Sequence, residues 1–383
     1  MIKSRRDFLR SLGTGAAAGA AVHWPWGENS AAYAVEPGRT QQSDGFIRLN
    51  SNENAYGPSL KVADAIRSAT DLVNRYTFMK YAEVTERIAS FHKVKPEQVL
   101  FGCGSTEILR VAACAFLGGG RQLIQASPTF EASEHYAKSV DAEVISLRLN
   151  PRFEHDLDVM LARTGPSTGL VYICNPNNPT ASLTPRKDLE SFISKLPATT
   201  HVLMDEAYHH YAGRSEMYAS FIDHPLIDER VVVTRTFSKV YGLAGLRLGY
   251  AIASRRAIEE MRKFLTQDSL NAIVAEAASV AIGDAEGVQD FVKRNSDDRQ
   301  EFFNQAMGRM LMPIDSHANF VMMNIQHPAE EVIEHFRKHN ILIGRYFSAM
   351  NNYIRVSLGT PEQMRAFWQT WDLLPWSKKF MHH

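Results

Sequence analysis

The sequence predicts an α/β fold: a large domain whose mostly parallel central sheet lies between helices, plus a smaller α+β domain. Three short apolar runs support this prediction, at residues 170–174, 202–204 and 231–233. Uninterrupted apolar runs are typical of parallel strands that are buried on both faces. Polar residues follow each run, and the carboxyl ends of neighbouring parallel strands lie at one edge of a sheet. We therefore expect a functional site along that edge.

The remaining elements follow from hydrophobic periodicity. Apolar residues at helical spacing predict helices over 81–92 and 186–195, which alternate with the strands of a large domain covering residues 76–275. A helical stretch over about 271–310 leads into a small C-terminal domain, residues 276–383. The other elements expected in that domain are strands at 320–323 and 353–356 and a helix over 328–339. Residues 46–75 are expected to form an N-terminal arm and part of the small domain.

The polar residues after the three runs suit the chemistry of pyridoxal 5′-phosphate. A lysine forms the covalent link to the aldehyde of this cofactor, and a carboxylate keeps its pyridine nitrogen protonated so that the ring withdraws electrons. Hydrogen-bond donors are needed at the ring hydroxyl, and cationic and hydroxyl groups at the phosphate. In that order, the candidates for these roles are Lys239, Asp205, Asn178 with Tyr208, and Ser238 with Arg247.

These motifs, in this order along the chain, resemble those of class I/II aminotransferases of fold type I, and most of all the histidinol-phosphate aminotransferase branch. The resemblance covers about residues 47–360 and implies the aspartate-aminotransferase-like fold. It implies that Ser105 and Thr106, at a helix start suited to a phosphate, contact the cofactor phosphate. It also implies that Phe130 stacks on the pyridine ring. A homodimer with shared active sites is expected, in which Tyr76 reaches the cofactor phosphate of the partner subunit.

The resemblance further implies transamination, in which an amino-acid or amino-phosphate donor gives its amino group to a 2-oxo acid. The expected catalytic residues are Lys239, Asp205 and Tyr208. Arg355 is expected to bind the α-carboxylate of the donor. Arg345 is expected to bind an anionic group at the donor's distal end, with a solvated arginine at a strand end as the alternative. Asn54 and Tyr56, in the N-terminal arm, complete the expected substrate-binding set.

The chain departs from the family pattern at three positions. Ala181 stands where relatives carry glycine, Thr77 where they often carry proline, and His317 where aspartate is common. If the turn at Ala181 needs a positive φ, alanine costs about 1 kcal/mol there. A decarboxylase or a β-lyase of the same fold is an alternative, because it would use the same anchor residues. A non-catalytic periplasmic binding module is the alternative from another class, and the joint presence of Lys239, Asp205 and Arg355 argues against it.

The N-terminus carries a second motif. Residues 4–10, Ser-Arg-Arg-Asp-Phe-Leu-Arg, resemble a twin-arginine export signal, and residues 32–34, Ala-Tyr-Ala, offer a cleavage site. We expect residues 1–34 to be a signal peptide that engages the twin-arginine export machinery, 35–45 to be a linker, and the mature enzyme to be periplasmic. The apolar stretch at 12–22 is too short for a stable membrane span. Because histidine biosynthesis is cytoplasmic, we expect an exported enzyme to use another substrate.

The charge balance and the cysteine content bear on nucleic-acid, membrane and metal binding. With 42 basic and 42 acidic residues the chain shows no electrostatic signature of nucleic-acid or membrane binding. His209 and His210 are adjacent, so their side chains point apart, and we expect no metal site. The three cysteines, at positions 103, 114 and 174, fit neither a disulfide framework nor a zinc site. We expect them to be buried free thiols.

Overall fold

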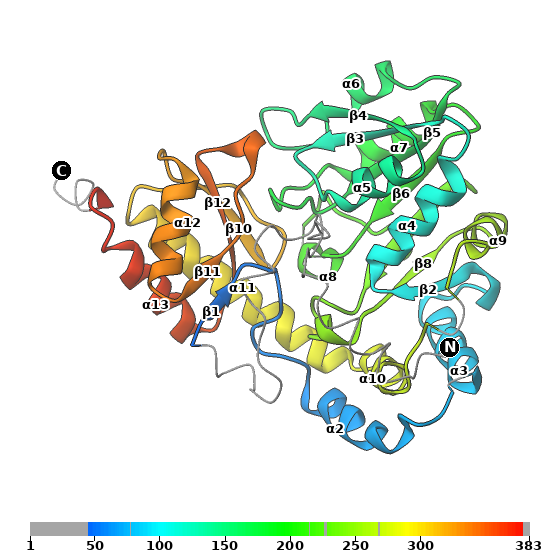
Figure 1. Cartoon of the computed structure of the whole chain (residues 1–383), viewed down its shortest axis with the longest axis horizontal. Coiled ribbons are helices and arrows are strands. Elements are labelled where there is room, and N and C mark those ends of the chain that lie inside the picture. The colour runs from blue at the N-terminus through cyan, green and yellow to red at the C-terminus, as the bar shows by residue number, and fades with distance from the viewer. Residues whose placement is uncertain (1–44, 77, 214, 226–227, 267–268, 378–383) are drawn as a thin grey trace, which may run out of the picture. The chain divides into compact units, whose positions relative to one another are not determined.

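A seven-stranded sheet provides the edge that the sequence predicts. In the computed structural model, which describes residues 45–76, 78–213, 215–225, 228–266 and 269–377, its strand order is β2-β8-β7-β6-β5-β3-β4 (Figure 1). The strands are β2 Val99–Cys103, β3 Gln122–Ser127, β4 Glu143–Arg148, β5 Thr168–Cys174, β6 His201–Asp205, β7 Val231–Thr236 and β8 Leu248–Ile252. Strands β3 to β7 run parallel to one another, and β8 is antiparallel to both of its neighbours, β2 and β7. The predicted mostly parallel sheet is confirmed.

Helices pack around this sheet, and every residue of the interior strand β5 is buried. These helices are α3 Phe78–His92, α4 Ser105–Phe116, α5 Ala132–Ser139, α6 Leu157–Ala162, α7 Arg186–Lys195, α8 His209–Ala212 and α9 Arg255–Arg262. The range of α7 matches the predicted one, and α3 begins at Phe78 instead of residue 81. Apolar side chains of helices and strands form one core, exemplified by Ile88, Val171 and Phe192.

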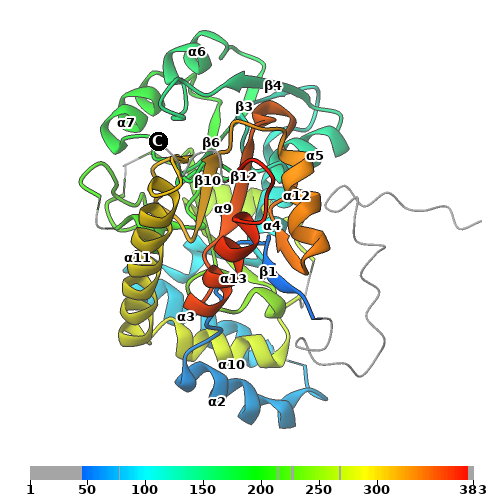
Figure 2. The same ribbon diagram turned by 90° about the vertical axis from the view of Figure 1, so that its left-hand side faces the viewer.

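A second, smaller core is built from both ends of the described chain. Antiparallel strands form a sheet of order β12-β10-β9, and a parallel pair joins β1 to β11. The elements are β1 Ile47–Leu49, β9 Met312–Pro313, β10 Phe320–Asn324, β11 Ile341–Ile343, β12 Tyr353–Ser357, α11 Ala285–Met307, α12 Ala329–Lys338 and α13 Pro361–Trp371 (Figure 2). Leu49 of β1 joins Phe336 and Trp371 in this core. The predicted strands and the helix of the small domain are confirmed.

The segments between the two cores differ from the expectation in detail. Helix α2, Leu60–Ser68, packs on α10, Ala272–Ala281, and its Val62 belongs to the larger core rather than the smaller. The helical stretch expected over 271–310 is divided into α10 and α11. The reason is Asp284, whose carboxylate caps α11 by accepting a hydrogen bond from the backbone N–H of Gly287 at 3.3 Å. Short 3-10 turns lie at Ala69–Leu72, Pro96–Gln98, Ala244–Leu246 and Ser348–Met350. The domain boundaries stay a prediction.

Several expectations fall on residues outside the described ranges. They are the signal at 1–34, all of the linker except Gly45, and Thr77. Within those ranges, no helix combines the length and the apolar character that a bilayer crossing requires. The three cysteines are free thiols. The expected burial holds for Cys174 but is wrong for Cys103, which is exposed because it ends β2, a strand at the edge of the sheet, and Cys114 is only partly buried.

Candidate active site

The three predicted strand ends meet at one place. β5, β6 and β7 are neighbours in the sheet, and their register sets Cys174 beside Asp205 and Asp205 beside Thr234. A cavity of about 430 Å³ opens at these ends. It is lined by the predicted residues Ser105, Thr106, Phe130, Asn178, Asp205, Tyr208, Ser238, Lys239, Arg247 and Arg355. Residues that are distant in the sequence therefore form one site, as the parallel arrangement predicts.

Lys239 is the nucleophile candidate on the cavity wall. Its Nζ donates hydrogen bonds to the backbone oxygens of Ser51 at 3.3 Å and Asn52 at 3.0 Å. Burial lowers the pKa of Lys239 to about 8, and the positive charges of Arg355 and Arg247 contribute to the decrease. A lowered pKa increases the fraction of neutral amine near neutral pH, and the neutral amine is the form that attacks an aldehyde.

Asp205 ends β6 and is only 2% exposed. Its carboxylate accepts hydrogen bonds from the hydroxyl of Tyr172 at 2.9 Å and from the backbone N–H of Ala207 at 3.1 Å. Burial raises the pKa of Asp205 to about 6. A protonated pyridine nitrogen would supply the cation that a buried carboxylate needs, so this position fits the pyridoxal phosphate ring.

A further part of the cavity wall suits a phosphate. Helix α4 begins at Ser105, directly after Gly104, whose φ of +73° is easily adopted only by glycine. A side chain at Gly104 would overlap the guanidinium of Arg247. Arg247 Nη1 in turn donates to the hydroxyl of Ser238 at 3.4 Å. A helix start, a cation and a hydroxyl thus converge, which is the donor set that binds phosphate groups.

Tyr208 and Asn178 lie beside the lysine and the arginine. The Tyr208 hydroxyl accepts a hydrogen bond from Asn52 Nδ2 at 3.0 Å, and its ring centre lies 5.4 Å from Lys239 Nζ. Burial raises the pKa of Tyr208, so the phenol stays protonated and remains able to donate a hydrogen bond. Asn178 accepts a hydrogen bond from Arg355 Nη1 at 2.7 Å, which links the cofactor side of the cavity to the predicted substrate side.

Arg355, on β12, is the predicted substrate-binding cation on the cavity wall. Its Nη2 donates to the backbone oxygen of Asn50 at 2.6 Å, while its Nε is buried without a hydrogen-bond partner. Burial lowers the pKa of Arg355 to about 10, and the charge of Arg345 adds to this effect. The hydrogen bonds described for Arg355 go to neutral oxygen atoms. The carboxylate of a substrate would therefore meet a positive charge that these bonds do not neutralise.

Four predicted residues lie outside the wall of this cavity. Tyr76 is 83% exposed. Asn54 donates to the backbone oxygen of Val240 at 2.9 Å, and the Tyr56 hydroxyl donates to Asp298 at 2.8 Å. Arg345 forms an ion pair with Glu131 and stacks on Phe347, with 4.1 Å from the guanidinium carbon to the ring centre.

Two departures from the family pattern contact each other. Ala181 has a φ of +59°, so the turn does require the left-handed conformation considered from the sequence. The backbone N–H of His317 donates to the carbonyl of Ala181 at 2.9 Å. His317 also pairs with Asp315, with 3.3 Å between imidazole nitrogen and carboxylate oxygen. The altered turn and the altered C-terminal segment therefore form one local structure.

Sequence reasoning missed two residues that hold the site together. Tyr172 sits within an apolar run and reads as a core residue, yet it donates to Asp205. Asn52 is 2% exposed, has a φ of +54° and donates to Tyr208, while its backbone N–H donates to Ser357 at 2.8 Å. The only available signal for Asn52 was its place in the polar arm segment Asn-Ser-Asn-Glu-Asn.

Known proteins share this sequence and architecture. The sequence profile of the family "Aminotransferase class I and II" matches residues 44–370. A histidinol-phosphate aminotransferase from Bacillus cytotoxicus is 34% identical over 322 residues, which is 83% of this chain and 86% of the relative. A structure from Erwinia carotovora atroseptica, provisionally named histidinol-phosphate aminotransferase, is 30% identical at a TM-score of 0.82 and covers 88% of this chain and 97% of its own. The Sinorhizobium meliloti enzyme, solved with pyridoxal 5′-phosphate, is 24% identical at a TM-score of 0.80 over 87% and 90% of the two chains.

Proposed function

Because the chain belongs to the class I and II aminotransferases, it is a transaminase that uses pyridoxal 5′-phosphate, and we propose that Lys239, Asp205 and Arg355 carry its reaction. The observation that supports these roles is that all three side chains line one cavity at the ends of the parallel strands. Lys239 would hold the cofactor, Asp205 would pair with its ring nitrogen, and the start of α4 with Arg247 would bind its phosphate.

The chemistry that the cofactor supplies is the withdrawal of electrons from the α-carbon of the amino donor. Arg355 binds the α-carboxylate of the donor and thereby fixes the direction of the α C–H bond. Lys239, as a neutral amine, takes the proton from that carbon and returns it during the transfer. Asp205 stays ionised against the ring nitrogen, and Tyr208 donates a hydrogen bond toward the ring oxygen. The buried surroundings of Lys239 favour its neutral form, which this role requires.

The substitution Lys239→Ala tests the assignment. We expect turnover to be lost, while the cofactor still binds through its phosphate and ring contacts, as measured by equilibrium dialysis. Lys263→Ala, at an exposed position on the surface, is the matched control. Wild-type turnover in the Lys239 variant would contradict the proposed role.

The donor that fits this site best carries an anionic distal group, as an amino phosphate of the histidinol-phosphate type or an acidic amino acid does. Relatives with the histidinol-phosphate name support the first, and the position of Arg345 near Arg355 supports either. A screen of amino donors with 2-oxo-acid acceptors, followed by cofactor absorbance, identifies the donor. Release of CO₂ or loss of a β-substituent in the same screen would instead indicate a decarboxylase or a β-lyase.

The active unit is proposed to be a homodimer. Exposed apolar side chains cluster on consecutive segments around α2 and the start of α3: Leu60 82%, Val73 63%, Tyr76 83%, Phe78 61% and Met79 84% exposed. Burial of such a cluster against a second copy would stabilise the pair through the hydrophobic effect. Tyr76, which lies outside the cavity of its own chain, would then be available to the cofactor phosphate of the partner.

Export by the twin-arginine route to the periplasm is a separate proposal. It rests on the sequence at 4–10 and on the Ala-Tyr-Ala cleavage site at 32–34. Replacement of Arg5 and Arg6 by lysine is expected to retain a folded, active enzyme in the cytoplasm, as measured by activity in cell fractions. Unchanged recovery in the periplasm would show that the arginine pair is not an export signal.

A further inference from the structure

A buried ion pair involves Glu206, the residue that follows Asp205. Glu206, the next residue, is 1% exposed, and Arg235 of β7 is 2% exposed. Arg235 donates to Glu206 Oε2 from Nε and from Nη2, each at 3.1 Å. Glu206 also accepts hydrogen bonds from the Ser220 hydroxyl at 2.6 Å and the Phe221 backbone N–H at 2.7 Å. Neither charge of the pair contacts the cavity, so the mechanism above does not use them.

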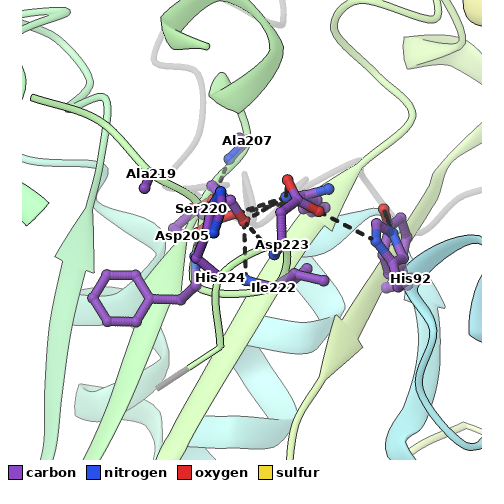
Figure 3. A network of polar contacts seen from close by, with 12 residues as sticks. His92, Asp205, Ala207, Ala219, Ser220, Ile222, Asp223 and His224 are labelled. Carbon is purple, nitrogen blue, oxygen red and sulfur yellow. Dashed lines mark hydrogen bonds and ion pairs between the residues drawn. The ribbon is translucent and has the colours of Figure 1, made fainter. Parts of the chain in front are cut away.

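The pair belongs to a network that joins the strands of the site. Arg235 Nη2 also donates to Asp223 at 3.2 Å, and Asp223 lies 3.8 Å from the Nδ1 of His92 on α3. Figure 3 shows Ser220 and Asp223 close to Asp205, with the contact from Asp223 to His92. The backbone N–H of Glu206 donates to Thr234 at 2.9 Å, one residue before Arg235. The network therefore connects the end of β6, which carries Asp205, to β7, which leads to Lys239.

The charges of Asp205 and Glu206 oppose each other. Two adjacent carboxylates in a buried environment each favour the protonated form of the other. Burial raises the pKa of Asp205, and the negative charge of Glu206 contributes to that rise. The titratable groups whose charges act on Asp205 are Tyr172, Cys174, Tyr208, Lys239 and Glu206; those around the ion pair are Asp223, His92, His209, His210, Tyr218, Tyr241 and Tyr250. Arg235 supplies the fixed positive charge that contacts Glu206 directly.

We propose that Glu206 and Arg235 are positioning residues, and that the charge of Arg235 cancels that of Glu206 so that Asp205 stays ionised against the pyridine nitrogen of the cofactor. The inference rests on the proposed role of Asp205. Glu206 anchors the chain after Asp205 to Ser220 and Phe221, and Arg235 cancels the charge that this anchoring carboxylate introduces. Without Arg235, the uncompensated Glu206 charge would favour protonation of Asp205. Without Glu206, the uncompensated Arg235 charge would favour its ionisation.

The test uses full-length protein and measures the dissociation constant of pyridoxal phosphate by equilibrium dialysis from pH 5 to pH 9. Affinity that depends on ionised Asp205 falls as the pH drops through the pKa of that carboxyl. Arg235→Met is expected to raise the pH at which the affinity falls by about half a unit or more, and Glu206→Gln is expected to lower that pH. The double variant is expected to return to the wild-type position. Arg235→Lys keeps the charge and is expected to leave the midpoint near that of the wild type.

A pair with a merely structural role would behave differently. Both single variants would then lose affinity at every pH without opposite shifts of the midpoint, and the double variant would be no better than either; that result overturns the proposal. Should Arg235→Met fail to fold, Glu206→Gln alone decides, because an unchanged or raised midpoint contradicts the charge argument. Dialysis needs no turnover, so this outcome is independent of the Lys239→Ala assay that tests the proposed function.

Discussion

At the scale of single residues, the ion pair between Arg345 and Glu131 bears most directly on which amino donor the enzyme accepts. Both side chains are about half exposed, and Glu131 directly follows Phe130 on the cavity wall. Both charges also act on Arg355. An anionic distal group of a donor would therefore meet an arginine that already has a carboxylate partner. Exposed ion pairs contribute only about 0–1 kcal/mol, so a better-placed substrate group can displace Glu131.

Arg345→Ala is expected to lower kcat/KM for acidic or phosphorylated donors by about ten- to a hundredfold, because paired charge-assisted hydrogen bonds are lost. Neutral donors such as alanine should lose far less. Arg355→Ala is the matched control, since it should penalise all α-amino acids alike. Steady-state kinetics with both donor classes checks this, and an equal loss for both in the Arg345 variant would exclude the specificity role.

Glu131→Gln is expected to act in the opposite direction. Removal of the competing carboxylate frees Arg345, so the ratio of kcat/KM for an acidic donor to that for a neutral donor should rise, by up to about fivefold for an exposed pair. The same kinetic assay measures this ratio. A ratio that falls would indicate that Glu131 holds Arg345 in its substrate-binding position instead of competing for it.

At the scale of elements, the contact between β8 and the start of α4 forms the phosphate end of the site. Gly249 of β8 lies so close to Ser105 and Gly104 that an added side chain would overlap their backbone atoms. That overlap cannot be relieved by a rotamer change, because backbone atoms are involved. The first turn of α4 can therefore face the cavity only because position 249 has no side chain.

Gly249→Ala is expected to displace the start of α4, to lower the free energy of unfolding by about 1–3 kcal/mol and to weaken cofactor binding. Gly165→Ala, where an added methyl group meets no atom within 4 Å, is the control and should behave as wild type. Urea denaturation and cofactor dialysis measure the two effects. Wild-type affinity in the Gly249 variant would show that α4 does not bind the phosphate.

The sequence predicted strands better than it predicted tertiary contacts. β5, β6 and β7 could be located because buried parallel strands leave continuous apolar runs, and Asp205 and Lys239 could be assigned because each follows such a run. The antiparallel direction of β8 could not be predicted, because the direction of a strand within a sheet depends on how the chain crosses over. Local composition does not encode that path. The partners of Arg345 and Tyr172 were missed for the same reason: Glu131 and Asp205 are distant in the sequence, and only folding brings them close.

At the scale of the whole molecule, the exposed cluster around Tyr76 leads to a test of the proposed dimer. The Tyr76 and Phe78 rings stack with 5.4 Å between their centres, so the two side chains form one continuous apolar surface. Met79→Glu, at an 84% exposed position, introduces a charge that burial against a second copy would have to desolvate. We expect the dimer dissociation constant to rise at least tenfold in sedimentation experiments, together with a loss of activity at low protein concentration.

Leu373→Glu is the control for the dimer test. Leu373 is 61% exposed. It follows α13, a helix of the smaller core, and is far in the sequence from the Tyr76 cluster. The same charge at this position should leave sedimentation unchanged. An active monomer of the wild-type protein at micromolar concentration would contradict the shared-site proposal.

The pairing of β1 with β11 has a consequence for synthesis on the ribosome. Leu49 emerges early, yet its strand pairs with Ile341–Ile343, and its core neighbours include Trp371. Contacts between such distant residues close late, because a long loop must be ordered first. A nascent chain therefore keeps its first strand without a partner until translation is nearly complete. The smaller core can form only once almost the entire polypeptide has left the exit tunnel, so this protein matures after translation and not alongside it.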